Sequence, residues 1–517
     1  MSLVDRLGEY RKFRARSAPL PTGSSSYTCS DFFKLQNPRD KPKALSWDHR
    51  TSLDSVNRKT SPLKASPYNH QRAMVSLGAA RPASEYYPWE SISMRCISNI
   101  PSQSNEHENN TSKFCSVSCS KGETEYDLGV ALNYGHPIGS PQALRFITEH
   151  VEFIHNPPYA DWESCLTCGS TSALEIALRL FCNRGDTVIV EDFTYPGTLS
   201  AIQAQGLQPL GVDVDGCGLV PEVLDRKLQN WTSCQGPKPF VLYMIPTGQN
   251  PTGITQSAAR RREIYQVAEK HDLYILEDDP YYYLQMEGLH IDCMPSQEIK
   301  TFNTDAYLSQ LPPSYLSLDI SGRVLRLDST SKILAPGLRC GWVTGCSQII
   351  EKFASYSETG PISPSGPSQV MLYKLLDQTW GHQGFLEWLV SLSQKYRQRR
   401  DTLIKACLQH LPYDVCRWGV PDAGMFIRIS VDASKHPGFV KTDIPSEISA
   451  NLLIIEDRIF SHSQENGVLV SKGSWFTADR TSISTLFFRL TFVASPEESL
   501  VKGVEVFAQA VRSVLAK

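Results

Sequence analysis

Short apolar runs alternate with amphipathic stretches through the middle of the chain. The runs at residues 187–190, 240–245 and 273–276 are typical of strands in a sheet that is covered on both faces. Apolar residues recur at helical spacing over 173–181 and 258–271. Strands that alternate with helices predict crossover connections and a mostly parallel, mixed sheet. We therefore predict an α/β fold, with a three-layer α/β/α large domain at residues 124–350.

The pattern changes on either side of this region. Residues 369–411 have the spacing of a long helix, and short strands are predicted at 425–429 and 487–492. They indicate a smaller α+β domain over 351–517. Residues 1–70 are rich in Ser, Pro, Lys and Arg, and we expect an extended or partly ordered arm. Residues 71–123 are assigned to the N-terminal part of the small domain, with a polar loop insertion at 102–122.

Composition excludes several classes of function. The formal charge of -3 provides no general attraction to nucleic acid or to an anionic membrane, and no apolar run reaches the length of a membrane span. The 14 cysteines are scattered, which favours thiols in a reducing compartment, and Cys165 and Cys168 lack the partners of a zinc site, so no metal is predicted. Without an apolar signal segment we predict a cytoplasmic protein, and mitochondrial targeting stays open.

The most informative polar cluster follows a predicted strand at 323–327. It places Lys332 next to Ser329 and Ser331, with Arg339 further on. Lys332 would lie past the carboxyl end of the strand, where open α/β sheets bind ligands. A lysine can form a Schiff base with a carbonyl, and hydroxyls with a guanidinium suit a phosphate. A phosphorylated aldehyde is therefore a candidate ligand, and an ordinary surface loop is the alternative that this segment leaves open.

Three more polar clusters follow predicted strands. Asn250, after the strand at 240–245, has an amide that can donate to a ring oxygen or to a substrate carboxylate. Asp278 follows the strand at 273–276, and a buried aspartate keeps a pyridine nitrogen protonated; Tyr281 can share the ring's phenolic oxygen. Tyr195 can stack on a flat heterocycle. Taken singly these are ordinary turn or packing residues, but their order, with Lys332 last, favours a cofactor site.

Taken together, these clusters resemble the fold-type I pyridoxal-phosphate enzymes. They are similar in particular to the aromatic aminotransferases, including fungal ones, and to the kynurenine/2-aminoadipate aminotransferases. The resemblance covers residues 45–515 and rests on Ser76–Pro82, Leu132–Gly135, Gly169–Thr171, Tyr195–Gly197, Asn250–Gly253, Glu277–Tyr282, Ser329–Lys332, Arg339, Ala423–Phe426 and Arg489. It implies an aspartate aminotransferase-like fold, in which N- and C-terminal segments build the small domain.

The resemblance also implies a role for each site residue. Lys332 would carry the cofactor, pyridoxal 5'-phosphate, as an aldimine and later move the substrate's proton. Asp278 would pair with the pyridine nitrogen, Tyr281 and Asn250 would hold the ring oxygen, and Tyr195 would stack on the ring. Arg489, together with Asn250, would bind the substrate carboxylate. The residues implied for the phosphate are Ser170, Thr171, Ser329, Ser331, Arg339 and, from the neighbouring subunit, Tyr134.

The implied reaction is a ping-pong transamination in a homodimer with shared active sites. The partners would be an amino acid, aromatic (Trp, Phe or Tyr), and a 2-oxo acid such as 2-oxoglutarate or phenylpyruvate, with kynurenine and 2-aminoadipate still open as donors. The stretch Gly78–Pro82 departs from the family's glycine-rich sequence, and Thr171 replaces a usual glutamine. A β-lyase, a decarboxylase or an aminotransferase-like transcription regulator are the alternatives, although residues 1–70 lack the helices of a winged helix.

Overall fold

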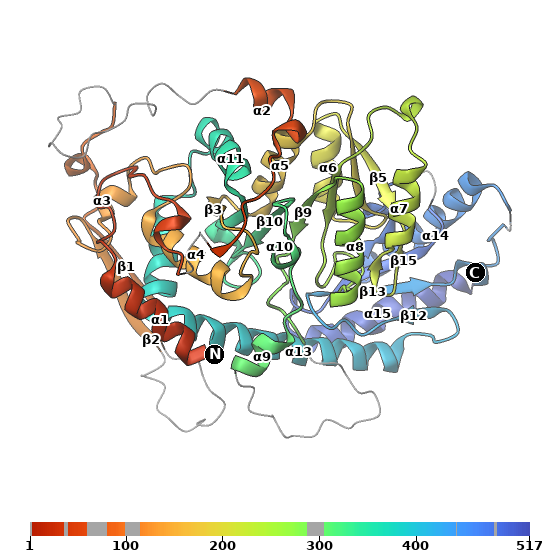
Figure 1. The fold of residues 1–517 in the computed structure, drawn as a ribbon. Coiled ribbons are helices and arrows are strands. Elements are labelled where there is room, and N and C mark those ends of the chain that lie inside the picture. Colours follow the sequence, from red (N-terminus) through yellow and green to blue (C-terminus); the bar gives the residue numbers. More distant parts are fainter. Residues whose placement is uncertain are drawn as a thin grey trace. The chain divides into compact units, whose positions relative to one another are not determined.

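The structure is a computed structural model that describes residues 3–35, 40–58, 80–98, 114–286, 304–440, 442–479 and 483–516. Contacts divide the chain into two compact units. The first unit is Met1–Asn183 with Ser314–Trp388, and the second is Arg184–Pro313 with Leu389–Lys517. Figure 1 shows both units and labels those helices and strands for which there is room. The domain boundaries that we predicted from the sequence stay a prediction.

The first unit combines the N-terminal helices of the chain with helices and strands from residues 314–388. Its helices are α1 (Leu3–Arg16), α2 (Leu53–Asn57), α3 (Leu128–Ala131), α4 (Pro141–Ile154), α5 (Ser170–Phe181), α10 (Tyr315–Leu318), α11 (Ser347–Thr359), α12 (Gly366–Leu372) and the π-helical η7 (Tyr373–Trp380). Its strands are β1 (Ser91–Ile97), β2 (Phe114–Ser120), β3 (Trp162–Thr167), β10 (Val324–Ser329) and β11 (Gly341–Cys346). The long helix α13 (Gly381–His410) begins here, and its residues from Leu389 on belong to the second unit.

Three strands of this unit lie in the order β3-β11-β10. Both pairings are antiparallel, so β3 and β10 run in the same direction and end at the same edge. Gly341 at the start of β11 is opposite Thr167 on one side and Ser329 on the other. The register therefore brings two segments that are distant in sequence to a single edge: the start of α5 and the connection between β10 and β11.

The hairpin of β1 and β2 revises one expectation. Residues 114–120 fall within the stretch that we expected to be a polar loop, but they form β2 and pair antiparallel with β1. The other residues of that stretch up to 113 lie outside the described part. The reason is alternation: Cys115, Val117 and Cys119 are less exposed than Phe114, Ser116 and Ser118 between them. The serines made the segment look uniformly polar in the sequence, so the alternation of exposed and less exposed residues that is typical of a strand was not recognised.

The N-terminal helix α1 lies in the segment where we predicted an extended or partly ordered arm. Leu3, Leu7 and Tyr10 form its buried stripe at helical spacing. Arg14 donates from Nε to Glu149 Oε1 over 2.8 Å and from Nη1 to Asp377 Oδ1 over 3.0 Å. The N-terminal charge cluster also contains Arg145, 3.1 Å from Asp377, and His382, 2.7 Å from Glu149. The partly buried contacts of Arg14 and the buried stripe of Leu3, Leu7 and Tyr10 anchor α1.

The second unit begins with parallel strands. Its strands are β4 (Thr187–Glu191), β5 (Gln208–Val212), β6 (Val214–Asp215), β7 (Gly218–Leu219), β8 (Val241–Met244), β9 (Tyr274–Asp278), β12 (Cys416–Trp418), β13 (Phe426–Val431), β14 (Ser471–Lys472) and β15 (Leu486–Thr491). Its helices are α6 (Pro196–Ala204), α7 (Pro221–Gln229), α8 (Ala258–Lys270), α9 (Thr304–Gln310), α14 (Pro445–Glu465) and α15 (Glu497–Leu515). β9, β8, β4 and β5 are neighbours in that order and parallel, which confirms the predicted α/β class with a mixed sheet.

The C-terminal part of this unit has an antiparallel sheet in the order β12-β13-β15-β14. Figure 1 shows α14 and α15 beside β13 and β15. Every other residue of β13, beginning with Ile427, packs with the helices in one apolar core, together with Phe488 and Phe507. The opposite face of β13 and β15 carries Phe and Arg side chains, and this face supplies part of the candidate site.

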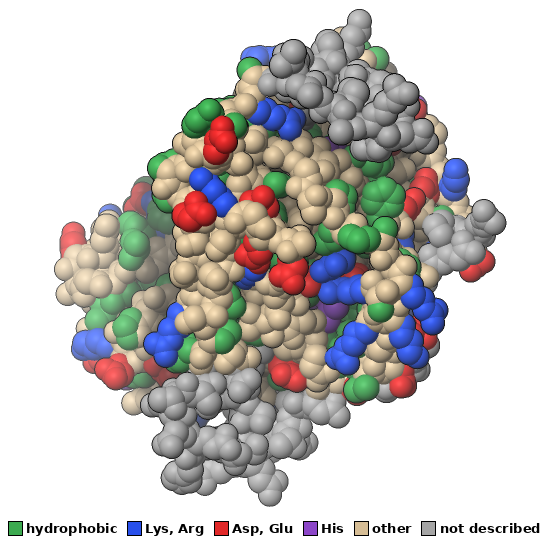
Figure 2. Space-filling model, turned by 90° about the vertical axis from the view of Figure 1, so that its left-hand side faces the viewer, with side chains coloured by type: hydrophobic (Ala, Val, Ile, Leu, Met, Phe, Trp, Pro, Cys, Tyr) green, Lys and Arg blue, Asp and Glu red, His purple; other side chains and the backbone are tan. Residues whose placement is uncertain are grey.

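No helix in the described ranges is long and apolar enough to cross a membrane. On the face shown in Figure 2, basic side chains gather at the lower right with acidic side chains beside them. The cytoplasmic location stays a prediction.

Candidate active site

The first set of predicted site residues lies at the edge that β3, β10 and β11 share. Ser170 and Thr171 begin α5 directly after β3, and Ser329 ends β10. Ser329 and Ser331 are joined, because Ser329 Oγ donates to Ser331 Oγ over 2.9 Å and accepts from Ser331 N over 3.1 Å. The structure thus brings the predicted hydroxyl donors of this unit to one strand edge.

Gly169 and Arg339 fit closely together at this edge. Gly169 has φ of 95°, and a Cβ built on it would lie 2.7 Å from Arg339 Nη2. Arg339 itself is in the left-handed region, and its Nη2 donates to Cys168 O over 3.0 Å. Only glycine therefore leaves room for the guanidinium beside the first turn of α5, where unpaired N–H groups attract anions.

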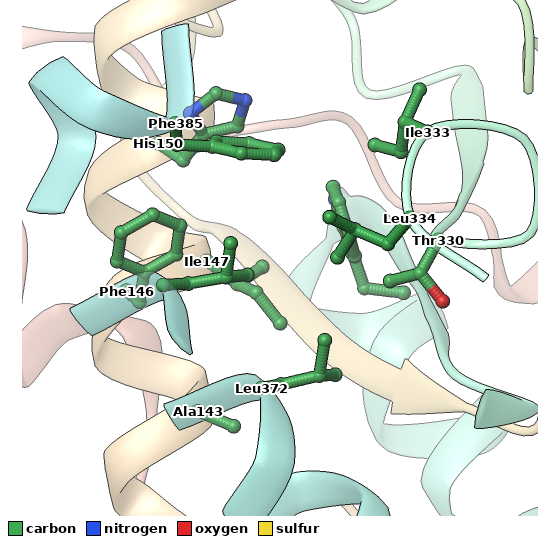
Figure 3. Close-up of a pocket in the computed structure, with 11 residues that line it drawn as sticks. Ala143, Phe146, Ile147, His150, Thr330, Ile333, Leu334, Leu372 and Phe385 are labelled. Carbon is green, nitrogen blue, oxygen red and sulfur yellow. The ribbon is translucent and has the colours of Figure 1, made fainter. Parts of the chain in front are cut away.

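Lys332 is in the turn between β10 and β11, past the strand end as predicted. The backbone of the turn is fixed on two sides: Leu334 N donates to Thr330 O over 2.8 Å, and Trp388 Nε1 donates to Ile333 O over 2.6 Å. Behind it is an apolar pocket of about 20 Å³. Figure 3 shows Ile333 and Leu334 on one side of this pocket, with Phe146 and His150 of α4 on the other. The lysine therefore extends from a firmly packed support.

The second set lies at the carboxyl ends of the parallel strands β4, β8 and β9. Tyr195 caps the start of α6 after β4, Asn250 follows β8, and Asp278 is the last residue of β9. In parallel strands these ends share one edge, so the strand order brings the three side chains to neighbouring positions. The sequence analysis likewise placed these residues just after the carboxyl ends of predicted strands.

Arg489 on β15 meets this set through Asn250. Its Nη1 donates to Asn250 Oδ1 over 2.8 Å, and its Nη2 donates to Ser471 Oγ over 2.9 Å. The guanidinium carbon lies 4.4 Å from the ring centroid of Phe426 and 4.9 Å from that of Phe476. Nε is buried without a hydrogen-bond partner, and burial lowers the pKa of Arg489 although Tyr281 and Tyr195 oppose that shift.

Asp278 is buried and accepts a hydrogen bond from Tyr243, whose hydroxyl is 2.7 Å from Oδ2. Burial, followed by the charge of Asp278, raises the pKa of Tyr281 above its ordinary value. Tyr281 packs edge-on against Phe426, with ring centroids 5.6 Å apart. The charge of Asp278 therefore acts together with burial on the Tyr281 hydroxyl, and the phenol stays protonated at neutral pH.

Glu191 supports the loop that carries Asn250. Its Oε2 accepts from Ile245 N and from Gln249 Nε2, both over 3.1 Å. Burial raises the pKa of Glu191 to about 7, even though these hydrogen bonds act to lower it. Sequence reasoning missed Glu191, Tyr243 and Ser471, since each looks like an ordinary strand residue. A tyrosine or glutamate within an apolar strand run is the signal that could have found two of them.

Two predictions lie outside these sets. Tyr134 is 56% exposed, and its predicted contact with a neighbouring subunit stays a prediction. Of the stretch Gly78–Pro82, Gly78 and Ala79 lie outside the described residues, while Arg81 is exposed and donates from Nη1 to Ser24 O over 3.2 Å.

The family model for "Aminotransferase class I and II" matches residues 104–507. The chain is 47% identical to aminotransferase swnA of Arthroderma benhamiae, over 91% of this chain and 92% of that protein. It is 40% identical to an aromatic amino acid aminotransferase of Schizosaccharomyces pombe, over 90% and 98% of the two chains. The chain belongs to the class I and II aminotransferase family.

Solved structures agree with this assignment. The aminotransferase Aro8 from Candida albicans superposes with a TM-score of 0.84 at 37% identity, covering 92% of this chain and all of that one. A kynurenine aminotransferase of Pyrococcus horikoshii, solved with PMP and kynurenine, has a TM-score of 0.61 at 28% identity over 74% and 83% of the two chains. The chain is a pyridoxal-phosphate-dependent aminotransferase with the aspartate aminotransferase-like α/β fold, as we predicted. Enzymes of this fold act on amino acids and 2-oxo acids.

Proposed function

We propose that the enzyme transfers the amino group of an aromatic amino acid, such as Trp, Phe or Tyr, to a 2-oxo acid such as 2-oxoglutarate or phenylpyruvate. The names of the fungal relatives support the aromatic donor. The observation that carries the proposal is the environment of Arg489. Its half-buried guanidinium is flanked by two phenylalanine rings, and its hydrogen-bond partners within the described part of the chain are neutral.

The proposed substrate contacts follow from the chemistry of that guanidinium. No Asp or Glu in the described ranges forms an ion pair with Arg489, and its Nε has no acceptor. A carboxylate supplies the missing charge and accepts two parallel hydrogen bonds, which is the strongest contact a guanidinium makes. Phe426 and Phe476 place apolar surface beside the guanidinium, and the lower local polarity strengthens the attraction to a carboxylate. Arg489 with Asn250 is therefore proposed to bind the α-carboxylate of either substrate.

The residues near Asp278 fit the ring of pyridoxal phosphate. When bound, this cofactor supplies a protonated pyridine ring that withdraws electrons as the substrate α-proton leaves. Asp278, held by Tyr243, provides the buried negative charge that keeps the ring nitrogen protonated. Tyr281, whose raised pKa keeps it protonated, donates to the ring oxygen with Asn250, and Tyr195 stacks on the ring.

The residues of the first unit fit the phosphate. Ser170, Thr171, Ser329, Ser331 and Arg339 supply hydroxyl and guanidinium donors at one strand edge, and Gly169 leaves the space that a Cβ would fill. Such a donor set matches a dianion. Lys332, on the turn beside these residues, is proposed to bind the cofactor's aldehyde carbon and to move the substrate proton with its Nζ.

A homodimer with shared sites is proposed as the assembly. The exposed ring of Tyr134 is free in this chain to reach the phosphate of a second subunit. Analytical ultracentrifugation at the protein concentration of the enzyme assay measures the mass of the assembly and so tests the dimer. A mixture of Lys332→Ala and Tyr134→Phe subunits tests whether the sites are shared. In a mixed dimer, one site would contain the intact Lys332 of one subunit and the intact Tyr134 of the other. That site should recover its affinity for the cofactor phosphate.

The test of the reaction is a panel of amino donors, read by bleaching of the cofactor's absorbance and by chromatography of both products. We expect Trp, Phe and Tyr to bleach it fastest and to form their 2-oxo acids in equal amount to the new amino acid. Lys332→Ala should abolish turnover while the fold is kept. Carbon dioxide release would instead identify a decarboxylase, and ammonia with pyruvate a β-lyase.

A further inference from the structure

Two cysteines face each other across the hairpin of β1 and β2. The register runs without interruption from Ser91↔Ser120 to Ile97↔Phe114, and within it Cys96 is directly opposite Cys115. Their Sγ atoms are 3.5 Å apart. Side chains opposite each other in an antiparallel pair have Cβ atoms about 4.5–5.5 Å apart, close to the range that a disulfide needs.

Packing holds both sulfur atoms on the inward face of the hairpin. Ile92 and Met94 alternate with exposed residues along β1 and pack against a small core, and Cys96 continues that alternation. On β2, Cys115, Val117 and Cys119 have the same orientation, since they also alternate with exposed residues. Trp380 Nε1 donates to Ile97 O over 2.7 Å, next to Cys96. The thiols therefore meet because the strand register places them opposite each other, and the two sulfur atoms must still approach from 3.5 Å to about 2 Å to form a bond.

We propose that Cys96 and Cys115 form a reversible disulfide by exchange with a small-molecule disulfide such as oxidised glutathione. The thiolate of one cysteine attacks a glutathione sulfur, which forms a mixed disulfide and releases one glutathione. The second cysteine, as thiolate, attacks the protein sulfur of that mixed disulfide and releases the second glutathione. The protein loses two electrons and two protons, and one glutathione disulfide becomes two thiols.

Two physical consequences follow from closing this bond. Burial, and then the hydrogen bond with Cys115, raise the pKa of Cys96, so exchange should become faster as pH rises above neutral. The bond would also close residues 97–114 into a covalent loop, which restricts the unfolded chain and stabilises the folded first unit. This inference does not depend on the substrate or the residue roles proposed above.

The experiment uses the whole holoenzyme in glutathione buffers of increasing oxidised fraction. After alkylation of free thiols, trypsin without reductant should release the peptide 96–113 linked to 114–121, lighter by two hydrogen atoms than the two separate peptides. Since 114–121 also contains Cys119, fragmentation must place the bond on Cys115. The melting temperature should rise by several degrees on oxidation and fall again with dithiothreitol.

The hairpin offers a matched control. Cys119 is on the same strand and face but opposite Ile92, so Cys119→Ser should keep both the linked peptides and the thermal shift. Cys96→Ser should lose both. If the Ser variant fails to fold, Cys96→Ala serves the same purpose. Free thiols at both positions in fully oxidised buffer, a bond to Cys119, or an equal thermal shift in Cys96→Ser would each overturn the proposal.

Discussion

Arg14 in the first unit and Arg489 in the second are both half-buried, but among the residues that the structure describes, carboxylates pair with Arg14 and none pairs with Arg489. Arg14 donates to Glu149 and Asp377, so its charge is neutralised within the fold. Arg489 donates to an amide and a hydroxyl, and its Nε has no acceptor. A buried charge is costly unless it is paired. The difference indicates that Arg14 serves folding, and it is the basis for our proposal that Arg489 binds the carboxylate of a ligand.

Arg428, a neighbour of Arg489, provides a second arginine for this comparison. Arg428 is its direct partner across β13 and β15 and also stacks on rings, those of Phe193 and Phe487. Burial lowers the pKa of Arg428 to about 10, although the charge of Asp192 opposes that shift. Arg428 thus has an anion of its own chain nearby, while sharing the sheet, the face and the aromatic setting of Arg489.

The largest expected effect is on catalysis. Arg489→Lys keeps the charge but loses the planar fork, so kcat/KM should fall about 100-fold or more, or roughly 3 kcal/mol of transition-state binding. Steady-state kinetics with an aromatic donor measure it. Arg428→Lys is the matched control and should stay within a few-fold of wild type. Equal losses in the two variants would remove the distinction between them.

In the first unit we expect an effect on stability alone. Glu149→Gln removes the charge that Arg14 and His382 share and should lower the free energy of unfolding by about 3 kcal/mol, measured in urea at pH 7. Burial opposes ionisation of Glu149, but hydrogen bonds from His382 and Arg14 prevail and lower its pKa. The wild-type advantage is therefore present above the ordinary glutamate pKa and disappears as pH falls through the lowered value. An unchanged gap at low pH, or a large change in kcat/KM, would contradict this.

Glu191 should show the opposite pH dependence. Its pKa is raised to about 7, so its contribution to stability is full below the ordinary glutamate value and is lost as pH rises through 7. Between pH 5 and pH 8.5 the wild type should lose roughly 3 kcal/mol that Glu191→Gln retains, because Gln keeps the hydrogen-bond acceptor without ionising. Thermal unfolding of both proteins across this range measures the difference, and parallel curves would refute it.

Tyr243→Phe should have the smallest effect of the four. It removes one hydrogen bond to Asp278 and leaves the carboxylate in place. We expect about 1–2 kcal/mol, seen as a roughly ten-fold weaker affinity for pyridoxal phosphate, with the melting temperature of the cofactor-free protein nearly unchanged. A fall in that melting temperature as large as the one for Glu149→Gln would make Tyr243 a folding residue.

The sequence predicted the parallel strands well, because β4, β8 and β9 are short apolar runs that end in polar residues or, in β8, are followed by them. Lys332, Asn250 and Asp278 could be placed at strand ends for that reason. The helix α1 and the strand β2 could not be predicted. The stripe of α1 consists of only three side chains, and its charges are paired with Glu149 and Asp377, far away in sequence. The contact of Arg489 with Ser471 likewise depends on strand pairing that no local pattern shows.

The packed turn that carries Lys332 has a consequence for cofactor affinity under the proposed role of this lysine. Hydrogen bonds at Thr330 and Ile333 and the nearly filled pocket fix the backbone of the turn before any ligand arrives. Ordering a residue's backbone costs roughly 1–2 kcal/mol, and a lysine side chain up to about 2 kcal/mol. The backbone of the whole turn is ordered when the protein folds, so cofactor binding does not incur that backbone cost again. Binding then restricts little more than one side chain, so most of the attraction between cofactor and protein remains available as affinity.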